Sequence, residues 1–173
     1  MMEVRLSGSG GQGLILAGII LAEAAIADGK EAIQSQSYGP EARGGSSKSE
    51  VIISDVRIHY PKVATPDLLL AMTQEALNKY GPDLKEDGLL IIDSTFVRDV
   101  PAHYKQVHAV PITQLAKDKC GRELFANIVA LGTIAKLTDT VGLTALEQAV
   151  LARVPKGTEE MNRLALQTGY QAV

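Results

Sequence analysis

The sequence predicts an α/β fold, a Rossmann-like sheet of mainly parallel strands with helices on both faces, in a single domain over residues 1–173. Strand-like and helix-like segments alternate through the first two-thirds of the chain, which is typical of a sheet covered by helices. Segments 68–72 and 89–92 are unbroken apolar runs, typical of strands buried on both faces. A turn with four glycines separates a short run with apolar Val4 and Leu6 from the long apolar segment 14–27, the layout of a first strand and a first helix.

The first half of the chain is expected to hold one helix and several strands. Segment 14–27 is rich in Ala, Ile and Leu nearly all round, which predicts a helix buried on more than one side. Gly29 stands where a C-terminal helix cap belongs. A polar strand is expected at 30–37, and a strand at 48–54 is expected to turn directly into a hairpin with 56–60.

The second half combines strands with a larger number of helices. Strands are expected at 66–72, 88–93 and 106–110. Helices are expected at 73–79, 124–137, 144–153 and 158–168, and 112–119 is expected as a helix or an irregular link. Thr73 and Thr158 are placed as N-caps of their helices, and Thr144 with Glu147 matches a capping box.

Composition limits the classes of function that fit the chain. It has 173 residues, of which 46% are hydrophobic and 21% charged, a balance typical of one globular domain. A net charge of −3 and only 4% aromatic residues argue against nucleic acid or an anionic membrane as a partner. The first residues lack a basic segment followed by an apolar core, so no signal peptide is expected and a cytoplasmic location is predicted.

The titratable residues predict neither a catalytic centre nor a metal site. Cys120 is the only cysteine, so it can form no internal disulfide, Cys-X-X-Cys pair or iron–sulfur cluster. His59, His103 and His108 lack the spacing of metal ligands. Asp93 follows a buried strand at the edge where α/β proteins bind ligands, but a cap or turn role is the favoured interpretation.

The first candidate site is the turn formed by Gly8, Ser9, Gly10, Gly11, Gln12 and Gly13. Glycines permit close approach of an anion, and the helix start adds unpaired N–H groups. The motif alone supports a phosphate site and a merely tight strand-to-helix turn about equally. A dinucleotide site would need an acid near the end of the second strand, where Gln34, Ser35 and Gln36 stand instead. The Walker A pattern also fails, because no Lys-Ser or Lys-Thr closes the turn.

The second candidate site is the loop that contains Tyr38, Gly39, Pro40, Glu41, Arg43, Gly44 and Gly45. Charged residues held between glycines and a proline suit a ligand or subunit contact. The alternative is a surface loop in which Arg43 pairs with Glu41 in solvent, an interaction that contributes little. Asn127, near the start of the helix expected at 124–137, is a further candidate, although an exposed or capping asparagine is the favoured interpretation.

Two glycine motifs in order are far more specific than either one alone. They are Gly-Ser-Gly-Gly-Gln-Gly at 8–13 and Gln-Ser-Tyr-Gly-Pro-Glu-Ala-Arg-Gly-Gly at 36–45. Together they resemble the gamma subunit of 2-oxoacid:ferredoxin oxidoreductases, and the similarity runs over essentially the whole chain, through Asn162 and Gly169 in the last helix. The second motif resembles the 2-oxoglutarate branch of this family most closely.

The resemblance implies a role inside a larger enzyme. Such complexes decarboxylate a 2-oxoacid on thiamine diphosphate with Mg²⁺, pass electrons through iron–sulfur clusters to ferredoxin, and release an acyl-CoA, which is succinyl-CoA in the 2-oxoglutarate branch. These cofactors are expected on partner chains, the alpha and beta subunits and a ferredoxin-like delta subunit. This chain has no cysteine set for a cluster and no Gly-Asp-Gly segment with a following Asn-Asn for diphosphate and Mg²⁺.

The resemblance also implies that the gamma domain packs over the active-site region and is linked to access of coenzyme A. We therefore expect residues 8–13 and the loop 38–45 to form that face, and Asn127 is a further candidate for cofactor binding. The turn amides would receive a phosphate, and Arg43 would meet an anion or an acid of a partner.

Other functions stay open at this point. The chain could serve a pyruvate- or branched-chain-2-oxoacid-specific member of the same family. It could instead be a stand-alone nucleotide-binding dehydrogenase of Rossmann type, or a free-standing regulatory or adaptor domain that binds CoA or a nucleotide. The isolated gamma chain is expected to be inactive, and a homo-oligomer of it is a further alternative.

Overall fold

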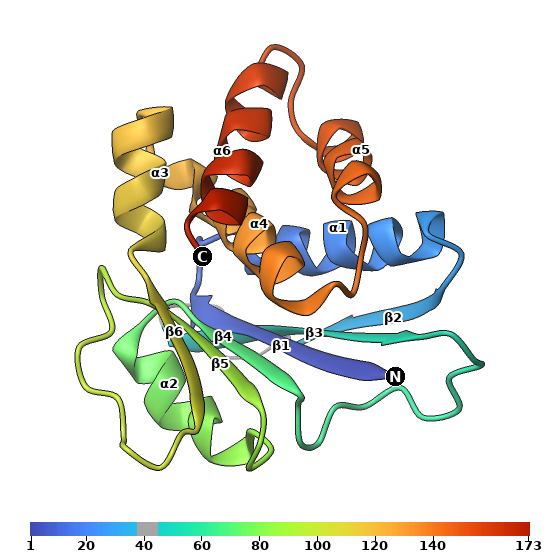
Figure 1. The fold of residues 1–173 in the computed structure, drawn as a ribbon, viewed down its shortest axis with the longest axis vertical. Helices are drawn as coiled ribbons and strands as arrows, with labels where there is room; N and C mark the ends of the chain where they lie inside the picture. The colour runs from blue at the N-terminus through green and yellow to red at the C-terminus, as the bar shows by residue number, and fades with distance from the viewer. Residues whose placement is uncertain (38–44) are drawn as a thin grey trace.

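The computed structural model describes residues 1–37 and 45–173 and confirms the predicted α/β class (Figure 1). The strands form one sheet in the order β2-β3-β1-β4-β5-β6. Their bounds are β1 (Met2–Ser9), β2 (Glu31–Gln36), β3 (Ser46–Ser54), β4 (Leu68–Ala71), β5 (Leu89–Asp93) and β6 (Gln106–Val110). The N-terminal strand β1 therefore lies inside the sheet and not at its edge.

The sheet is mainly parallel, with β3 as the exception. β1 pairs with β4, β4 with β5, and β5 with β6 in parallel register. β3 runs antiparallel both to β1 and to β2 and separates these two strands. The connection from β1 through the first helix to β2 therefore passes over one strand before it rejoins the sheet.

Helices cover both faces of this sheet, as the sequence predicts (Figure 1). One face carries α1 (Leu14–Ala27), α4 (Ala126–Thr138), α5 (Leu143–Arg153) and α6 (Glu159–Gln171), with α3 (Ile112–Cys120) beside them. The other face carries α2 (Gln74–Tyr80), followed by a short 3₁₀ segment at Gly81–Asp83. None of the helices in the described part of the chain is long and apolar enough to cross a membrane.

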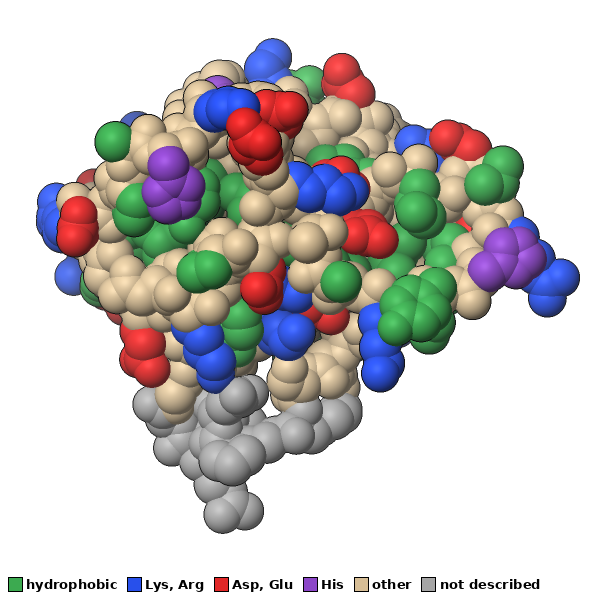
Figure 2. All heavy atoms as spheres, turned by 90° about the horizontal axis from the view of Figure 1, so that it is seen from below, with side chains coloured by type: hydrophobic (Ala, Val, Ile, Leu, Met, Phe, Trp, Pro, Cys, Tyr) green, Lys and Arg blue, Asp and Glu red, His purple; other side chains and the backbone are tan. Residues whose placement is uncertain are grey.

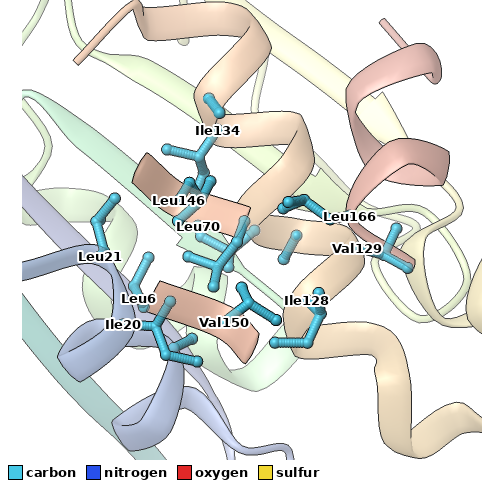
Figure 3. Packing of buried hydrophobic residues seen from close by; sticks show 14 of the residues in the cluster. Leu6, Ile20, Leu21, Leu70, Ile128, Val129, Ile134, Leu146, Val150 and Leu166 are labelled. Atoms are coloured by element: carbon cyan, nitrogen blue, oxygen red, sulfur yellow. The ribbon is translucent and has the colours of Figure 1, made fainter. Parts of the chain in front are cut away.

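The larger hydrophobic core lies between the sheet and the four-helix layer (Figure 3). Leu6 and Leu70 project from the strands toward Ile20 and Leu21 of α1 and toward Leu146 of α5. Helix α1 is buried on several sides because it lies between the sheet and α5, which explains why its sequence is apolar nearly all round.

Two glycines let α4 and α6 cross at very short range. A Cβ atom placed on Gly132 would lie 2.0 Å from the carbonyl oxygen of Leu166, and one on Gly169 would lie 1.8 Å from the carbonyl oxygen of Val129. The hydroxyl of Thr133 donates to the carbonyl of Gly169 at 3.2 Å and links the two helices at this point. The helix–helix contact is therefore built on backbone atoms, with no room for side chains between them.

The opposite face of the sheet holds a buried charged side chain in a central strand. Arg5, only 2% exposed, donates from Nε to Glu50 at 2.7 Å and from Nη1 to Asp83 at 2.5 Å. Its guanidinium also lies 5.6 Å from the ring centre of Tyr80 in α2. These contacts join β1 to β3 and to the segment after α2. On the surface of this face, acidic and basic side chains are interspersed (Figure 2).

Two local predictions from the sequence are wrong. Residues 56–60 form no strand, because β3 already uses both of its edges to pair with β1 and β2. The capping box at Thr144 does not form either, since α5 begins at Leu143 with Gly142 as its N-cap. The N–H of Gly142 instead donates to the carboxylate of Asp28 at 2.5 Å.

The other predicted helices are present, and their first and last residues differ slightly from the predicted ones. Thr73 caps α2 through a bond from the N–H of Ala76 at 3.2 Å, as predicted. Thr158 occupies the N-cap position of α6, but its hydroxyl donates to the carbonyl of Pro155 and caps no backbone N–H. The segment expected as a helix or a link is the helix α3, and Gly121 ends it at φ 81°.

Cys120 is expected to resist thiol reagents in the folded chain. It is 4% exposed at the end of α3, and burial raises the pKa of its thiol above the usual value, which lowers the thiolate fraction at neutral pH. We expect its reaction with a disulfide reagent at pH 7.5 to be at least about tenfold slower in the native chain than after unfolding in guanidinium. Equal rates in the two states would contradict the burial of this residue.

Candidate functional site

The glycine turn lies at the carboxyl edge of the sheet, between β1 and α1. Gly11 and Gly13 have φ angles of 86° and 73°, which side chains disfavour. The side-chain oxygen of Gln12 accepts a hydrogen bond from the N–H of Ser9 at 2.8 Å and closes the turn on itself. Gln12 therefore stabilises the turn.

Part of the glycine pattern is explained by tight packing alone. A Cβ atom on Gly8 would lie 2.2 Å from the side chain of Gln12 and 3.0 Å from Cβ of Met72. A Cβ atom on Gly13 would lie 2.6 Å from the side-chain nitrogen of Asn127. Gly11 differs from these two, because a Cβ atom there would meet no atom within 4 Å. Together with Gly10 and Gly13 it lines an open hollow on the protein surface.

This hollow combines the start of helix α1 with a largely apolar lining. It measures about 480 Å³ and is lined by Ser9, Gly10, Gly11, Gly13, Leu14, Ile15, Leu16, Ile19, Ser37 and Ser47. Helix α1 begins there at Gly13 with no side-chain cap and no acid in its first turn. The free N–H groups of the first turn and the positive end of the helix therefore meet the hollow. The side chains of Ile15 and Ile19 are four residues apart on one helix face and supply an apolar wall.

Asn127 is tied to the glycine turn and is buried, so the exposed alternative of the sequence interpretation is wrong. The capping alternative fits its bond to an N–H at the start of α4. Asn127 is 6% exposed in the first turn of α4, and its side-chain nitrogen donates to the carbonyl of Gly13 at 3.2 Å. Its side-chain oxygen accepts from the N–H of Ile128 at 2.9 Å. Asn127 therefore ties the start of α4 to the start of α1, segments more than 100 residues apart in the sequence.

Replacing Asn127 by Ala is expected to lower the free energy of unfolding by about 1–2 kcal/mol, because a buried hydrogen bond between two helix starts is lost. The measurement is equilibrium unfolding in urea. Asn78→Ala on α2 is the control, since Asn78 is an exposed asparagine whose removal should change the free energy by less than about 0.5 kcal/mol. Equal effects of the two substitutions would contradict the assigned role of Asn127.

Asp93 has the cap and turn role that the sequence favoured. It is fully buried at the end of β5 and accepts bonds from the hydroxyl and the N–H of Thr113 at 2.5 and 3.2 Å. It also accepts from the N–H of Thr95 at 3.0 Å. Because these donors occupy its carboxylate, Asp93 fixes the start of α3 and offers nothing to a ligand.

Most of the second candidate loop lies outside the described residues. These residues are Tyr38, Gly39, Pro40, Glu41, Arg43 and Gly44, and their predicted contacts stay predictions. Gly45, directly before β3, is described and half-buried. Ser37 and Ser47, which flank the loop, both line the hollow beside the glycine turn. The described residues on either side of the loop thus lie beside the glycine turn at one edge of the sheet.

The strand order weighs against the dinucleotide hypothesis. In that hypothesis the end of the second strand lies next to the glycine turn and carries an acid for the ribose. Here β3 lies between β1 and β2, so Gln36 at the end of β2 is two strand spacings, about 10 Å, from β1. In the described part of the chain, no group of three His, Cys, Asp or Glu residues could hold a metal ion.

The sequence profile of the family described as Pyruvate ferredoxin/flavodoxin oxidoreductase matches residues 3–172. The chain belongs to this family. The match covers almost the whole chain, including both glycine motifs, and it confirms the resemblance to this group of oxidoreductases.

Individual members of this oxidoreductase family are close relatives of the chain. It is 49% identical to the 2-oxoglutarate synthase subunit KorC of Methanocaldococcus jannaschii, with 98% of this chain and 92% of that protein aligned. The crystal structure of a keto/oxoacid ferredoxin oxidoreductase gamma subunit from Geobacter sulfurreducens superposes with a TM-score of 0.90 at 55% identity. That comparison covers 99% of this chain and 98% of the Geobacter chain.

A third member of the family contains this fold as part of a longer chain. The ketoisovalerate oxidoreductase subunit VorA of Methanothermobacter thermautotrophicus is 36% identical over 85% of this chain, but the matching region is only 30% of VorA. Relatives of this domain therefore occur both as separate chains of about the same length and as part of a longer chain.

Proposed function

We propose that this chain is the gamma subunit of a multi-subunit 2-oxoglutarate:ferredoxin oxidoreductase. The proposed complex decarboxylates 2-oxoglutarate oxidatively to succinyl-CoA and reduces ferredoxin, and its location is the cytoplasm. The observation that carries the choice of 2-oxoacid is the 49% identity to a 2-oxoglutarate synthase subunit over nearly both whole chains. Identity to the ketoisovalerate oxidoreductase subunit is lower, at 36%.

The proposal leaves the redox chemistry to partner subunits. Thiamine diphosphate, Mg²⁺ and iron–sulfur clusters would lie on alpha and beta subunits and on a ferredoxin-like delta subunit. A cluster needs several cysteine thiolates, whereas Cys120 is the single cysteine of this chain and is buried. The residues of this chain would bind and orient a substrate or a partner, and none would act as a catalytic group.

The hollow beside the glycine turn is the proposed contact for coenzyme A. The N–H groups at the start of α1 suit a phosphate, and the apolar wall of Ile15, Leu16 and Ile19 suits the aliphatic part of a pantetheine arm. Its volume of about 480 Å³ falls within the range of ligand pockets. Gly10 and Gly11 would form the floor on which the phosphate approaches the main chain.

The experiment is an affinity purification of the tagged chain from its native cells. The eluate is assayed for CoA-dependent reduction of ferredoxin or a viologen dye with 2-oxoglutarate, pyruvate and 2-oxoisovalerate in parallel. Thiamine- and cluster-bearing partners together with the highest kcat/KM for 2-oxoglutarate are the expected result. A higher kcat/KM for pyruvate or 2-oxoisovalerate would leave the family assignment intact but show that the complex acts on that 2-oxoacid. A chain that is purified alone with a bound nucleotide would overturn the subunit role.

A further inference from the structure

A second, smaller cleft lies next to the glycine turn, between α1, α4 and α6. It measures about 260 Å³ and is lined by Leu16, Arg122, Leu124, Phe125, Asn127, Ile128, Val154, Pro155, Thr158 and Asn162. Most of these side chains are apolar, and Leu16 also lines the hollow at the glycine turn. The cleft is therefore continuous with the face that the proposed function assigns to the active-site side of the complex.

Two polar groups of the cleft have no partner within residues 1–37 and 45–173. The guanidinium of the exposed Arg122 makes no ion pair or hydrogen bond with this part of the chain. Asn162 is 4% exposed, and its side-chain nitrogen donates to the carbonyl and the hydroxyl of Thr158. The side-chain oxygen of Asn162 accepts no hydrogen bond from the described residues, so it is free to accept one from a group that enters the cleft.

The starts of two helices also line the cleft. Asn127 and Ile128 stand in the first turn of α4, and Thr158 is the N-cap residue of α6. Both helices have 13 residues, long enough for an appreciable dipole. Glu159 and Glu160 in the first turn of α6 offset the dipole of that helix, so the cationic group that the cleft offers is Arg122. Apolar walls beside this guanidinium suit an apolar group that stands next to an anion.

The size of the cleft favours an inserted side chain over a free cofactor. Pockets for whole small-molecule ligands usually measure roughly 300–1,000 Å³, above the 260 Å³ found here. Pockets that anchor one aliphatic or aromatic side chain of a partner protein are smaller and lie among exposed apolar residues. Leu124, at the rim, is 65% exposed in this chain, a cost that is removed when a partner covers it.

We propose that this cleft is a docking pocket for a partner subunit of the oxidoreductase. Its occupant is a segment in which an aliphatic or aromatic side chain stands next to an Asp or Glu residue. The apolar side chain fills the cleft against Leu16 and Phe125, the acid pairs with Arg122, and a backbone N–H of the segment donates to Asn162. The inference rests on the proposed function, because it requires that the chain be a subunit of a complex.

The test compares variants of the tagged chain produced together with its partner subunits. Arg122→Glu and Leu124→Asp are each expected to lower the amount of partner subunit recovered with the tagged chain about tenfold or more. Lys62→Glu and Val56→Asp are matched controls, since both residues are exposed on the segment between β3 and β4, at the opposite edge of the sheet. Equal resistance of all four variants to limited proteolysis verifies that they are folded.

A photo-crosslinking residue at position 124 identifies the occupant directly. The expected product joins this position to a partner subunit, at a peptide in which an acid stands beside an aliphatic or aromatic residue. Unchanged recovery of partners with Arg122→Glu and Leu124→Asp, or a product that joins two copies of this chain, would overturn the docking pocket. Failure of the unmodified chain to recover any oxidoreductase subunit would instead overturn the proposed function.

Discussion

The Gly169→Ala variant is expected to lose about 3 kcal/mol in the free energy of unfolding, at the upper end of the usual cost of overpacking. The added methyl group would lie 1.8 Å from the carbonyl oxygen of Val129 and 3.0 Å from the N–H nitrogen of Thr133. Both are backbone atoms of α4 and cannot rotate away, so the two helices must move apart. The gain in helix propensity from Gly to Ala, about 1 kcal/mol, offsets only part of this cost.

Equilibrium unfolding of the purified chain in urea measures the effect of Gly169→Ala. Gln167→Ala is the control, because Gln167 is exposed on the same helix and its replacement should change the free energy by less than about 0.5 kcal/mol. The expected separation of α4 from α6 should also lower the hydrogen-exchange protection of both helices. A free energy of unfolding within about 1 kcal/mol of the value for the unmodified chain would show that α4 and α6 leave room for a methyl group where they cross.

The Ile15→Asp variant is expected to raise the KM of the assembled enzyme for CoA about tenfold or more, with the KM for the 2-oxoacid nearly unchanged. Ile15 is 39% exposed in the first turn of α1 and lines the hollow proposed to receive the phosphate of CoA. A carboxylate there would repel the phosphate and occupy the free N–H groups itself. Loss of a charge-assisted contact of about 1.5–3 kcal/mol corresponds to a factor of ten or more.

This substitution is suited to the test because it should leave the fold intact. An acid in the first turn of a helix is stabilising, so Ile15→Asp should not lower the melting temperature of the chain. Ile15→Asn is the matched control, which has nearly the same size as Asp but no charge and should raise the KM for CoA much less. Equal KM values of the Asp and Asn variants for CoA would show that no phosphate of CoA binds at this position.

The sequence predicts the elements well where the signal is local. The apolar runs at β4 and β5, the apolar helix α1 and the glycine turn all depend on residues close together in the chain, and all are confirmed. The wrong hairpin at 56–60 has a non-local cause. Whether β3 pairs with its successor or with β1 and β2 is decided by the whole sheet, and the pattern of β3 alone fits either arrangement.

For the candidate site too, the features with a local sequence signal are predictable and those that depend on distant residues are not. The glycine turn was located by its spacing, and the apolar wall of Ile15 and Ile19 could have been found from their separation by four residues. Asn127 was not recognised as part of the turn, because its partner Gly13 is more than 100 residues away. The cleft around Arg122 and Asn162 could not be predicted, since it forms only when three helices pack side by side.

The internal position of β1 has a consequence for synthesis of the chain on the ribosome. β1 is made first, yet its neighbours β3 and β4 are complete only when Ser54 and Ala71 have left the ribosome. At about 5–20 residues per second, roughly 2–9 s pass between the end of β1 and the end of β3, and roughly 3–12 s between the end of β1 and the end of β4. Helices α4 and α5, which belong to the same hydrophobic core as Val4 and Leu6, are synthesised later still. Nascent chains that stop before the end of β3 therefore expose an unpaired apolar strand, which makes them substrates for chaperones and proteases.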